Sequence, residues 1–505
     1  MRNNQLMMAI DIGTTSVKCM IINDLGEVKA SASNGYSIMN RFESWVEQEP
    51  IDWWHATIKS IKDCLKKVHV NKVKAISFSG QMSAPVFLDN KGHPVYPSIL
   101  ISDTRSQNQS DYLYKNHLKN FTERTGNEPI NAFTVSKLLW MKEKEPKIMK
   151  MTSKFVFPKD FVRYKITGHI GTDPTDAGNS LLYNAEEKCW NWRLISDLGL
   201  STDIFPDIKS SGNQFGVVTN DASKVTGLVE GTPVITGAAD IACSQIGTGA
   251  VNDNTLSITL STSGQIVMGI PNINKKGIGK VTFHNGAIED SNYAMGTIFT
   301  GGLGVEWGFK KLYNKQLMDK SDYQELDRLT NEMKNYPPGS NGLLFLPFLV
   351  GSSTPYYDIQ DRAAWIGMSL HQEKSLMLHS ILEGITFNIL ENVQVMNEMD
   401  LIIQKVHLGA GGSQNKVWCK MIADVLGQNV SLLENRDGSA LGAAILAGTG
   451  VGIFDSIKSA VESIVKVNQY IMFDKTKNED YKKLFKGYQE VYQSLNYYYH
   501  TYTKT

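Results

Sequence analysis

Two short stretches of glycine and hydroxyl-bearing residues stand between apolar runs and could bind phosphate. The first, residues 8–22, has the polar tip Gly13-Thr14-Thr15-Ser16, and the second, residues 256–268, has the tip Ser261-Thr262-Ser263-Gly264. Apolar runs on both sides of a short polar turn predict β-hairpins. A tip without bulky side chains leaves backbone N–H groups and hydroxyls free to hold a phosphate. The candidate phosphate ligands are Thr14, Thr15, Ser261, Thr262 and Ser263.

A carboxylate precedes the first tip. Asp11 stands two residues before Gly13, where an aspartate can hold a magnesium ion directly or through water. Taken alone, the first hairpin is equally typical of an ordinary edge hairpin with a polar turn. The second copy favours a duplicated domain that closes on one nucleotide, because a unit repeated at a long interval indicates duplication.

A single carboxylate also follows a predicted buried strand near the middle of the chain. That strand ends in the small residues Gly237-Ala238-Ala239, and Asp240 comes next without a charged neighbour. An isolated carboxylate is costly to bury unless it has a function. We predict that Asp240 is a general base, and the alternative is a helix N-cap. Asp173 and Asp176 could also be bases, but helix capping or a turn is the commoner role of such residues.

Two polar loops in the first half are candidate substrate contacts. The predicted strand 74–79 runs into Gly80 and then Gln81, Met82 and Ser83. Ligands of open α/β sheets bind beyond the carboxyl ends of the strands, although a strand end that needs a glycine explains the pattern equally well. Farther along, Asp103 and Arg105 could bind the hydroxyls of a polyol or form a surface ion pair, which is the commoner outcome.

Composition restricts the class of protein. A chain of 505 residues with 42% apolar residues is long enough for two large domains. Its net charge of zero argues against nucleic acid or a membrane surface as the partner. Five scattered cysteines and ten histidines show no metal-binding spacing, which indicates reduced thiols in a cytoplasmic protein. No apolar run approaches membrane-spanning length, and a strand is predicted too early for a signal peptide.

The second half of the chain contains two glycine-rich turns. Residues 296–307 predict a strand, a glycine corner and the start of a helix, and residues 406–413 predict a strand that runs into a glycine turn. The second turn could be mistaken for a dinucleotide fingerprint, but the third glycine of that motif would fall on Gln414. This argues against an NAD-dependent oxidoreductase, and the absence of GxxxxGK[ST] argues against a P-loop kinase. The stretch 247–254 fits a connection between a domain 1–246 and a domain 247–505.

In this order, the motifs resemble the FGGY carbohydrate kinase family, most closely its xylulose kinases, over essentially the whole chain. The resemblance is carried by residues 10–15, 47–50, 52–54, 125–127, 133–140, 158–160 and 237–240. It implies an α/β fold of two duplicated, actin-like ATPase (ribonuclease H-like) domains with a central cleft for ATP and substrate. It also implies Mg²⁺-ATP as the phosphoryl donor and a small sugar as the acceptor. Dimers are common in this family, although no residue pattern here requires a homodimer.

The same resemblance implies further nucleotide contacts in the second half, at Gly302, Glu306, Gly411, Gly412, Ser413 and Asn415. The substrate that it implies is D-xylulose, phosphorylated on a primary hydroxyl to D-xylulose 5-phosphate.

Three motifs of the chain depart from the xylulose kinase pattern. Ser83 replaces a histidine, Ile101-Ser102 replaces Trp-Asn before Asp103, and Ser352-Ser353 replaces Glu-Arg. Lost hydrogen bonds to a polyol can shift specificity by orders of magnitude. Gluconate, ribulose or another ketose or polyol therefore remain alternative substrates, and a non-metabolic actin-like ATPase remains an alternative function.

Overall fold

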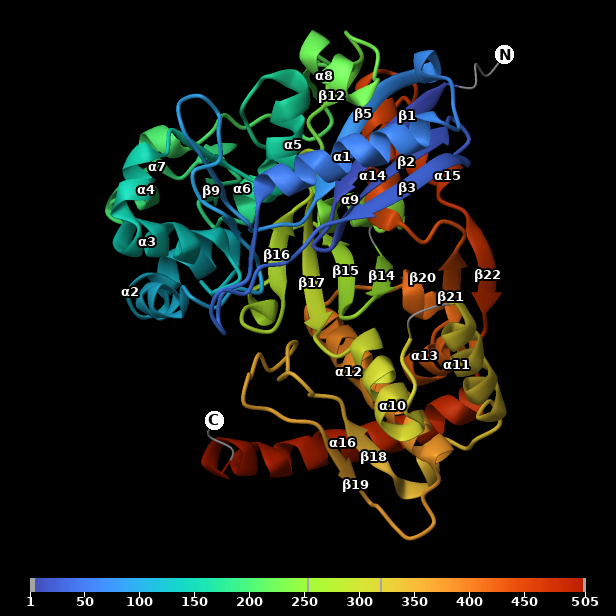
Figure 1. Cartoon of the computed structure of the whole chain (residues 1–505). Helices are drawn as coiled ribbons and strands as arrows, with labels where there is room; N and C mark the ends of the chain where they lie inside the picture. The colour runs from blue at the N-terminus through green and yellow to red at the C-terminus, as the bar shows by residue number, and fades with distance from the viewer. Residues whose placement is uncertain (1–4, 252–253, 318–319, 503–505) are drawn as a thin grey trace.

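The computed structural model describes residues 5–251, 254–317 and 320–502, and its two lobes are built on separate sheets (Figure 1). The first sheet has the order β11-β12-β5-β1-β2-β3, with β13 beside β5. Its strands are β1 Leu6–Ile12, β2 Ser16–Asn23, β3 Val28–Gly35, β5 Val73–Gly80, β11 Gln214–Val217, β12 Pro233–Ile235 and β13 Ala238–Ala239. The second sheet has the order β16-β17-β15-β14-β20-β21-β22. Its strands are β14 Thr255–Leu260, β15 Gly264–Ile270, β16 Thr282–Asn285, β17 Asn292–Ile298, β20 Lys405–Gly409, β21 Val430–Leu433 and β22 Val467–Ile471.

The two sheets share one arrangement of strand directions. In each sheet, three antiparallel strands (β1-β2-β3 and β14-β15-β17) lie beside two parallel strands (β5-β12 and β20-β21) and then an antiparallel strand (β11 and β22). The two hairpins predicted from the sequence open these two sheets. The α/β class and the duplication are therefore confirmed.

Helices cover both faces of the first sheet because its central strands are apolar on both sides. Every residue of β1 except Asp11 is buried, as is typical of a strand covered on both faces. One face carries α1 Pro50–Leu65, α5 Pro158–Thr167 and α8 Asn220–Thr226. The other face carries α9 Asp240–Gly247, α14 Gly438–Gly450 and α15 Ile457–Ile464. The second half of the chain thus supplies α14 and α15 to the core of the first sheet.

Helices α9 and α14 cross at backbone contact distance between the two sheets. A Cβ atom on Gly442 would lie 1.8 Å from the carbonyl oxygen of Cys243, and one on Gly247 would lie 2.0 Å from that of Gly438. No side chain fits at either point, so the crossing requires glycine. Tyr293 and Met295 of β17 belong to the same buried cluster as these helices, which joins the two lobes.

The second sheet packs against a bundle of longer helices. These are α10 Gly302–Tyr313, α11 Lys320–Glu332, α12 Lys374–Glu398, α13 Lys416–Leu426 and α16 Lys475–Tyr502. A two-stranded ladder of β18 Leu344–Leu346 and β19 Ala364–Ile366 lies beside them. The buried residues Tyr481, Phe485, Tyr488 and Tyr492 attach α16 to this core.

A largely helical insertion between β5 and β11 forms the left part of Figure 1 and has its own core. It contains α2 Gln107–Thr125, α3 Thr134–Lys144, α4 Pro146–Met151, α6 Pro174–Gly178 and α7 Trp192–Asp197. Short ladders join β4 Glu47–Gln48 to β7 Ser98–Ile99, β6 Val86–Leu88 to β8 Lys154–Val156, and β9 Tyr183–Asn184 to β10 Cys189–Trp190. The insertion reaches the second lobe where the Asn127 amide exchanges hydrogen bonds of 2.7 and 2.8 Å with the backbone of Phe283.

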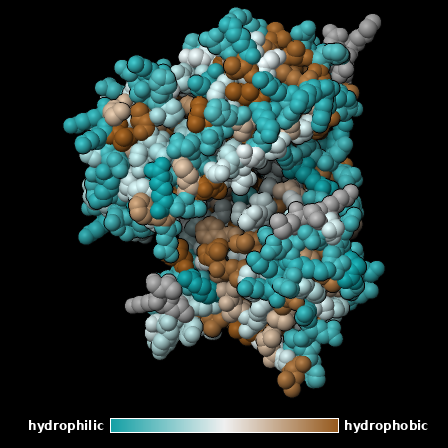
Figure 2. Space-filling model, in the orientation of Figure 1, coloured by the Kyte–Doolittle hydropathy of each residue, from teal (hydrophilic) through white to brown (hydrophobic). Residues whose placement is uncertain are grey.

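The surface of the molecule is hollowed between the lobes (Figure 2). Within the described ranges, no helix combines the length and hydropathy needed to cross a bilayer. All five cysteines are free thiols, and four of them are buried. Helix α9 ends at Gly247 and β14 begins at Thr255; residues 252 and 253 of the predicted connection lie outside the described residues. The division of the chain at 246/247 stays a prediction.

Candidate active site

The first hairpin turns at residues 13–15, and neighbouring residues donate hydrogen bonds to the carbonyl groups of this turn. The N–H of Gly13 donates to the carbonyl of Ser16 at 3.0 Å. Gln48 Nε2 donates to the carbonyl of Thr14 at 2.6 Å, and the hydroxyl of Tyr36 donates to the carbonyl of Gly13. Thr14 and Thr15 are exposed. The backbone of the tip is therefore fixed while its two threonine side chains face outward.

Asp11 lies one residue inside this hairpin, opposite Lys18 on β2 and Ser79 on β5. Burial raises the pKa of Asp11, and the neighbouring hydroxyl of Ser79 together with the charge of Lys18 partly offsets that rise. Its Oδ1 atom is buried and has no hydrogen-bond partner. An unpartnered buried carboxylate oxygen is costly, and a divalent cation would satisfy it. Asp11 therefore fits a magnesium ligand.

Asp240 is the first residue of α9 and follows β13, whose Ala239 pairs with Gly80 of β5. The N-cap of α9 is Ala239, so the alternative reading of Asp240 as the N-cap is wrong. Oδ1 of Asp240 accepts a hydrogen bond of 2.8 Å from the N–H of Ile241. Burial, followed by repulsion from Asp11, raises the pKa of Asp240 to about 7. A carboxylate with that pKa suits general-base catalysis near neutral pH.

Glycine lets the strand that leads to Asp240 approach β5. Gly237 has φ +81°, and a Cβ atom there would lie 2.3 Å from the carbonyl oxygen of Phe78. The chain can therefore leave β12, bend, and pair again with β5 as β13. Because β1, β5 and β13 are parallel, Asp11, the Gly80 loop and Asp240 all lie at one edge of the sheet, as ligands of α/β sheets do.

The loop after β5 is buried, and side chains hold its backbone. Gln81, Met82 and Ser83 are all at most 6% exposed. Gln81 Nε2 donates to Gln48 Oε1 at 2.9 Å, while Oε1 of Gln81 is buried without a partner. Ser83 has φ 63°, a rare conformation for serine, and its carbonyl accepts from Lys137 Nζ at 2.9 Å. Burial lowers the pKa of Lys137 to about 7.

Asp103 and Arg105 form an ion pair, but it is buried rather than at the surface as predicted. Arg105 Nη2 lies 2.6 Å from Oδ2 of Asp103, and Nη1 lies 2.8 Å from Oε1 of Glu47. The guanidinium group also lies 3.7 Å above the ring of Trp45. Both carboxylate oxygens of Asp103 already accept hydrogen bonds, from Arg105 and from the N–H of Val46. Asp103 as a substrate contact stays a prediction.

In the second lobe, the hairpin and the two glycine turns line one cavity of about 260 Å³. Seven of the predicted nucleotide contacts line it: Ser261, Thr262, Gly302, Glu306, Gly411, Gly412 and Asn415. Val305, Leu382 and Trp418 add apolar walls that suit a purine base. Ser263 and Ser413 are not part of the lining, and the hydroxyl of the buried Ser413 donates to the carbonyl of Ala410 at 2.7 Å.

Glycine also brings these turns against the second hairpin. The N–H of Gly302 donates to the carbonyl of Ser261 at 2.7 Å, and a Cβ on Gly302 would lie 2.5 Å from that oxygen. A Cβ on Gly412 would lie 2.6 Å from Cβ of Leu260. The N-terminus of α10 therefore reaches the hairpin tip, and helix N-termini favour phosphate.

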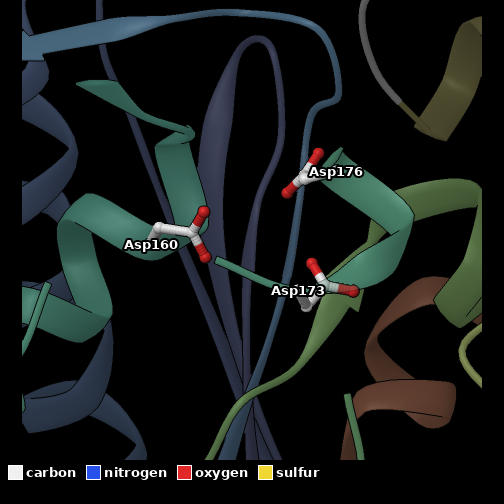
Figure 3. Close-up of side chains that lie close together, drawn as sticks. All are labelled: Asp160, Asp173 and Asp176. Atoms are coloured by element: carbon white, nitrogen blue, oxygen red, sulfur yellow. The ribbon is translucent and has the colours of Figure 1, made fainter. Parts of the chain in front are cut away.

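A buried ionic cluster beside this edge was not predicted from the sequence. Figure 3 shows Asp160 of α5, Asp173 before α6 and Asp176 of α6 pointing toward a common centre. Lys159 Nζ lies there, 2.6 Å from Asp160, 2.8 Å from Asp173 and 2.9 Å from Asp176. The three carboxylates are close enough to hold a metal ion, but the ammonium group occupies the centre, so they do not fit one.

Arg163 adds a second cation to this cluster, with Nη1 2.9 Å from Oδ1 of Asp160, so two cations face three carboxyl groups. Burial acts against the ammonium form of Lys159, but the three carboxylates outweigh it and raise the pKa of Lys159. Lys159 and further hydrogen bonds outweigh burial at Asp173 and lower its pKa, whereas burial raises the pKa of Asp176 well above its usual range. Asp173 also caps α6 by accepting from the N–H of Thr175 at 3.0 Å, as predicted.

Comparison with known proteins identifies similar sequences and structures. The chain matches the profile of the FGGY family of carbohydrate kinases, N-terminal domain, over residues 6–247 and that of the C-terminal domain over residues 262–451. It is 33% identical to the xylulose kinase of Bacillus subtilis (strain 168) over 489 residues, 96% of each chain. It is 25% identical to the gluconokinase of the same strain over 499 residues, 97% of this chain and 95% of that one. The crystal structure of xylulose kinase from Rhodospirillum rubrum, 24% identical, has a TM-score of 0.89 and covers 98% of this chain and 100% of its own, which shows the shared fold.

Proposed function

The chain belongs to the FGGY family of carbohydrate kinases and is an ATP-dependent sugar kinase, and from this premise we propose that its sugar is D-xylulose. The product is D-xylulose 5-phosphate. Family membership decides against the non-metabolic ATPase considered above. The observation that carries the mechanism is Asp240, a carboxylate with a pKa of about 7 at the sheet edge that also bears Asp11 and the Gly80 loop.

The charges around the substrate loops favour a neutral sugar over gluconate. A gluconate site needs a cation for the carboxylate of its substrate. Arg105 is already bound to Asp103 and Glu47, and Lys159 is bound to three aspartates. Lys137 donates to the carbonyl of Ser83, and burial lowers its pKa to about 7. These groups suit an uncharged polyol, in agreement with the higher identity to a xylulose kinase than to a gluconokinase.

Asp240 accepts the proton of the sugar's primary hydroxyl as the hydroxyl oxygen bonds to the γ-phosphorus of ATP. The bond between that phosphorus and the β–γ bridging oxygen breaks, and ADP leaves. Phosphoryl transfer depends on positioning and on charge stabilisation more than on covalent chemistry. Thr14 and Thr15 hold the phosphate chain from the first lobe, and Thr262 and Ser263 hold it from the second. The exposed threonines of the first tip and the cavity beside the second support this assignment.

Asp11 holds Mg²⁺ directly or through water, and its unpartnered buried oxygen supports that role. When bound, the ion neutralises charge on the phosphate oxygens. Gln81, Met82 and Ser83 contact the sugar, and the free Oε1 of Gln81 is available to a sugar hydroxyl.

The replaced motif residues differ in their bearing on substrate choice. Ser352 donates to Asp361 at 2.6 Å, and Ser353 donates to the carbonyl of Thr297 at 2.6 Å. Their hydroxyls therefore serve the packing of the second lobe. Ser83 lies on the substrate loop itself, so it is the replacement with the strongest expected effect on specificity. Ribulose, or another ketose or polyol, is the alternative substrate that this replacement leaves open.

The proposal also includes a homodimer in the cytoplasm. Dimers are common in the family that the chain resembles, and the five free cysteines fit a reducing compartment. Size-exclusion chromatography with light scattering measures the first property, and cell fractionation measures the second.

The experiment that tests the substrate is a coupled assay of ADP release with Mg²⁺-ATP. The panel contains D-xylulose, D-ribulose, other ketoses, pentitols and gluconate, with a control without sugar. We expect release to depend on D-xylulose. Dependence on gluconate alone would overturn the argument from paired cations, and dependence on another ketose would move the assignment to that sugar.

A further inference from the structure

We propose that Thr175 is a positioning residue for Asp240, and that Lys159 and Asp173 fix the direction in which its hydroxyl bonds. The backbone N–H of Ala239, the residue before Asp240, donates to Oγ1 of Thr175 at 2.8 Å. Thr175 is 1% exposed and belongs to α6, an element 64 residues earlier in the chain. This inference rests on the proposed role of Asp240 as the base.

The ionic cluster determines which partner the Thr175 hydroxyl donates to. Lys159 lies 2.8 Å from Oδ1 of Asp173, which keeps that aspartate ionised. Oδ2 of Asp173 accepts from Thr175 Oγ1 at 2.7 Å, from the Thr175 N–H at 3.0 Å and from Ser211 Oγ at 2.7 Å. An ionised carboxylate can only accept. The Thr175 hydroxyl therefore donates to Asp173, and its lone pair is left for the N–H of Ala239.

The contact with Thr175 is one of three that hold this short segment, since β13 pairs with β5 and the hydroxyl of Ser439 donates to the carbonyl of Asp240 at 3.1 Å. Strand β13 has only two residues, which pair with Ser79 and Gly80. The first N–H groups of α9 have no partner within the helix. A displacement of about 1 Å at a reacting group can reduce the rate roughly 100-fold. The bond from Thr175 therefore helps to set the position of the backbone that carries the Asp240 carboxylate.

The same lysine also contacts the strand that carries the substrate loop. A Cβ atom on Gly80 would lie 2.9 Å from Cβ of Lys159, so the backbone of β5 rests directly on the start of α5. Lys159 thus touches β5 through its backbone and β13 through Asp173 and Thr175. Lys159 is therefore in contact, directly or through Asp173 and Thr175, with the strand that precedes the base and with the strand that precedes the substrate loop.

A matched pair of variants tests the proposal. Thr175→Val removes the hydroxyl that accepts from Ala239. Thr172→Val removes a hydroxyl of the same segment that is equally buried but has no hydrogen-bond partner. We expect kcat of Thr175→Val to fall roughly 10- to 100-fold below that of Thr172→Val, with the KM for ATP unchanged. Thr175→Ser keeps the hydroxyl and should restore most of kcat.

Calorimetry, the comparison of kcat values and an assay of Asp240→Asn together distinguish the possible outcomes. The number of ADP-binding sites per chain, by calorimetry, normalises kcat to folded protein. Equal normalised kcat for Thr175→Val and Thr172→Val overturns the proposal, as does a fall that Thr175→Ser does not reverse. Asp240→Asn is assayed in parallel: wild-type turnover in that variant overturns the base assignment itself, whereas its inactivity beside a fully active Thr175→Val overturns only the role of Thr175.

Discussion

The two hairpins share one backbone plan and differ in charge. The first hairpin pairs Asp11 with Lys18, and the second has Thr259 and Gln265 at the corresponding register positions. The side chains of Tyr36 and Gln48 donate to the first tip, whereas backbone N–H groups of residues 301–303 donate to the second. The second tip also lines an apolar cavity.

This difference indicates that the two copies of a duplicated unit can have different functions. Hydroxyls and small residues at both tips suit contact with a phosphate chain, which we propose lies between the two lobes. A carboxylate suits only one of the two tips, because a second carboxylate would add a negative charge close to the phosphates. We therefore expect the first lobe to carry the ionic chemistry and the second lobe to carry the recognition of the nucleotide.

The substitution Asp240→Asn tests whether the first lobe carries the general base, and it has the largest expected effect. General-base catalysis typically contributes about 100- to 10,000-fold, so we expect kcat to fall by that amount while ATP binding, measured by calorimetry, is retained. Turnover close to that of the wild type would remove the base from the first lobe.

Asp11→Asn should have the next largest effect. Loss of a metal-orienting carboxylate reduces activity or metal affinity by roughly 10- to 100-fold, so the Mg²⁺ concentration for half-maximal rate should rise. Thr259→Val changes the corresponding position of the second hairpin and should leave the Mg²⁺ dependence unchanged. Equal shifts in both variants would contradict the division between the lobes.

Gly412→Ala tests the second lobe. The new Cβ would lie 2.6 Å from Leu260, and overpacking of this kind costs about 1–3 kcal/mol. We expect the KM for ATP to rise roughly tenfold while the KM for the sugar stays constant. Gly409→Ala is the control, because nothing lies within 4 Å of a Cβ at that position. A rise in the KM for the sugar instead would assign the wrong ligand to this cavity.

Close to neutral pH, the pH dependence gives the smallest expected effect, about a twofold loss of activity at the pKa itself. The base must be ionised, and the pKa of Asp240 is raised to about 7. Activity should therefore be full above this value and lost as pH falls through it, by close to tenfold per unit well below the pKa. The profile of kcat/KM for the sugar measures this limb in the free enzyme. A limb near pH 4 would mean that Asp240 titrates as an ordinary aspartate.

Local features of the site were predictable from the sequence. The two hairpins were predicted because apolar runs and polar tips are local patterns, and Asp240 was selected as a candidate base because its neighbours carry no charge. The glycine turns at Gly302 and Gly412 were also visible in the sequence, and both line the cavity. Their interpretation as nucleotide contacts came from the resemblance to the FGGY family.

Contacts between distant segments were not predictable in the same way. No periodic spacing relates Lys159, Asp173 and Thr175. Nothing in the sequence therefore shows that these residues form a chain of contacts that ends at the N–H of Ala239. Burial of the Asp103–Arg105 pair was missed because it depends on Glu47 and Trp45, more than fifty residues earlier. Side chains that come together only through tertiary packing leave no local pattern.

The placement of α14 has a consequence for how the protein is made. This helix completes one face of the first sheet, yet residues 438–450 are synthesised long after β1 and β5. This face of β1 and β5 therefore stays partly uncovered until residues 438–450 have been synthesised. A fragment that ends at residue 246 should expose this apolar face and aggregate, and a separately supplied second half should rescue its solubility. Although the protein is duplicated in form, its halves are expected to fold as one unit.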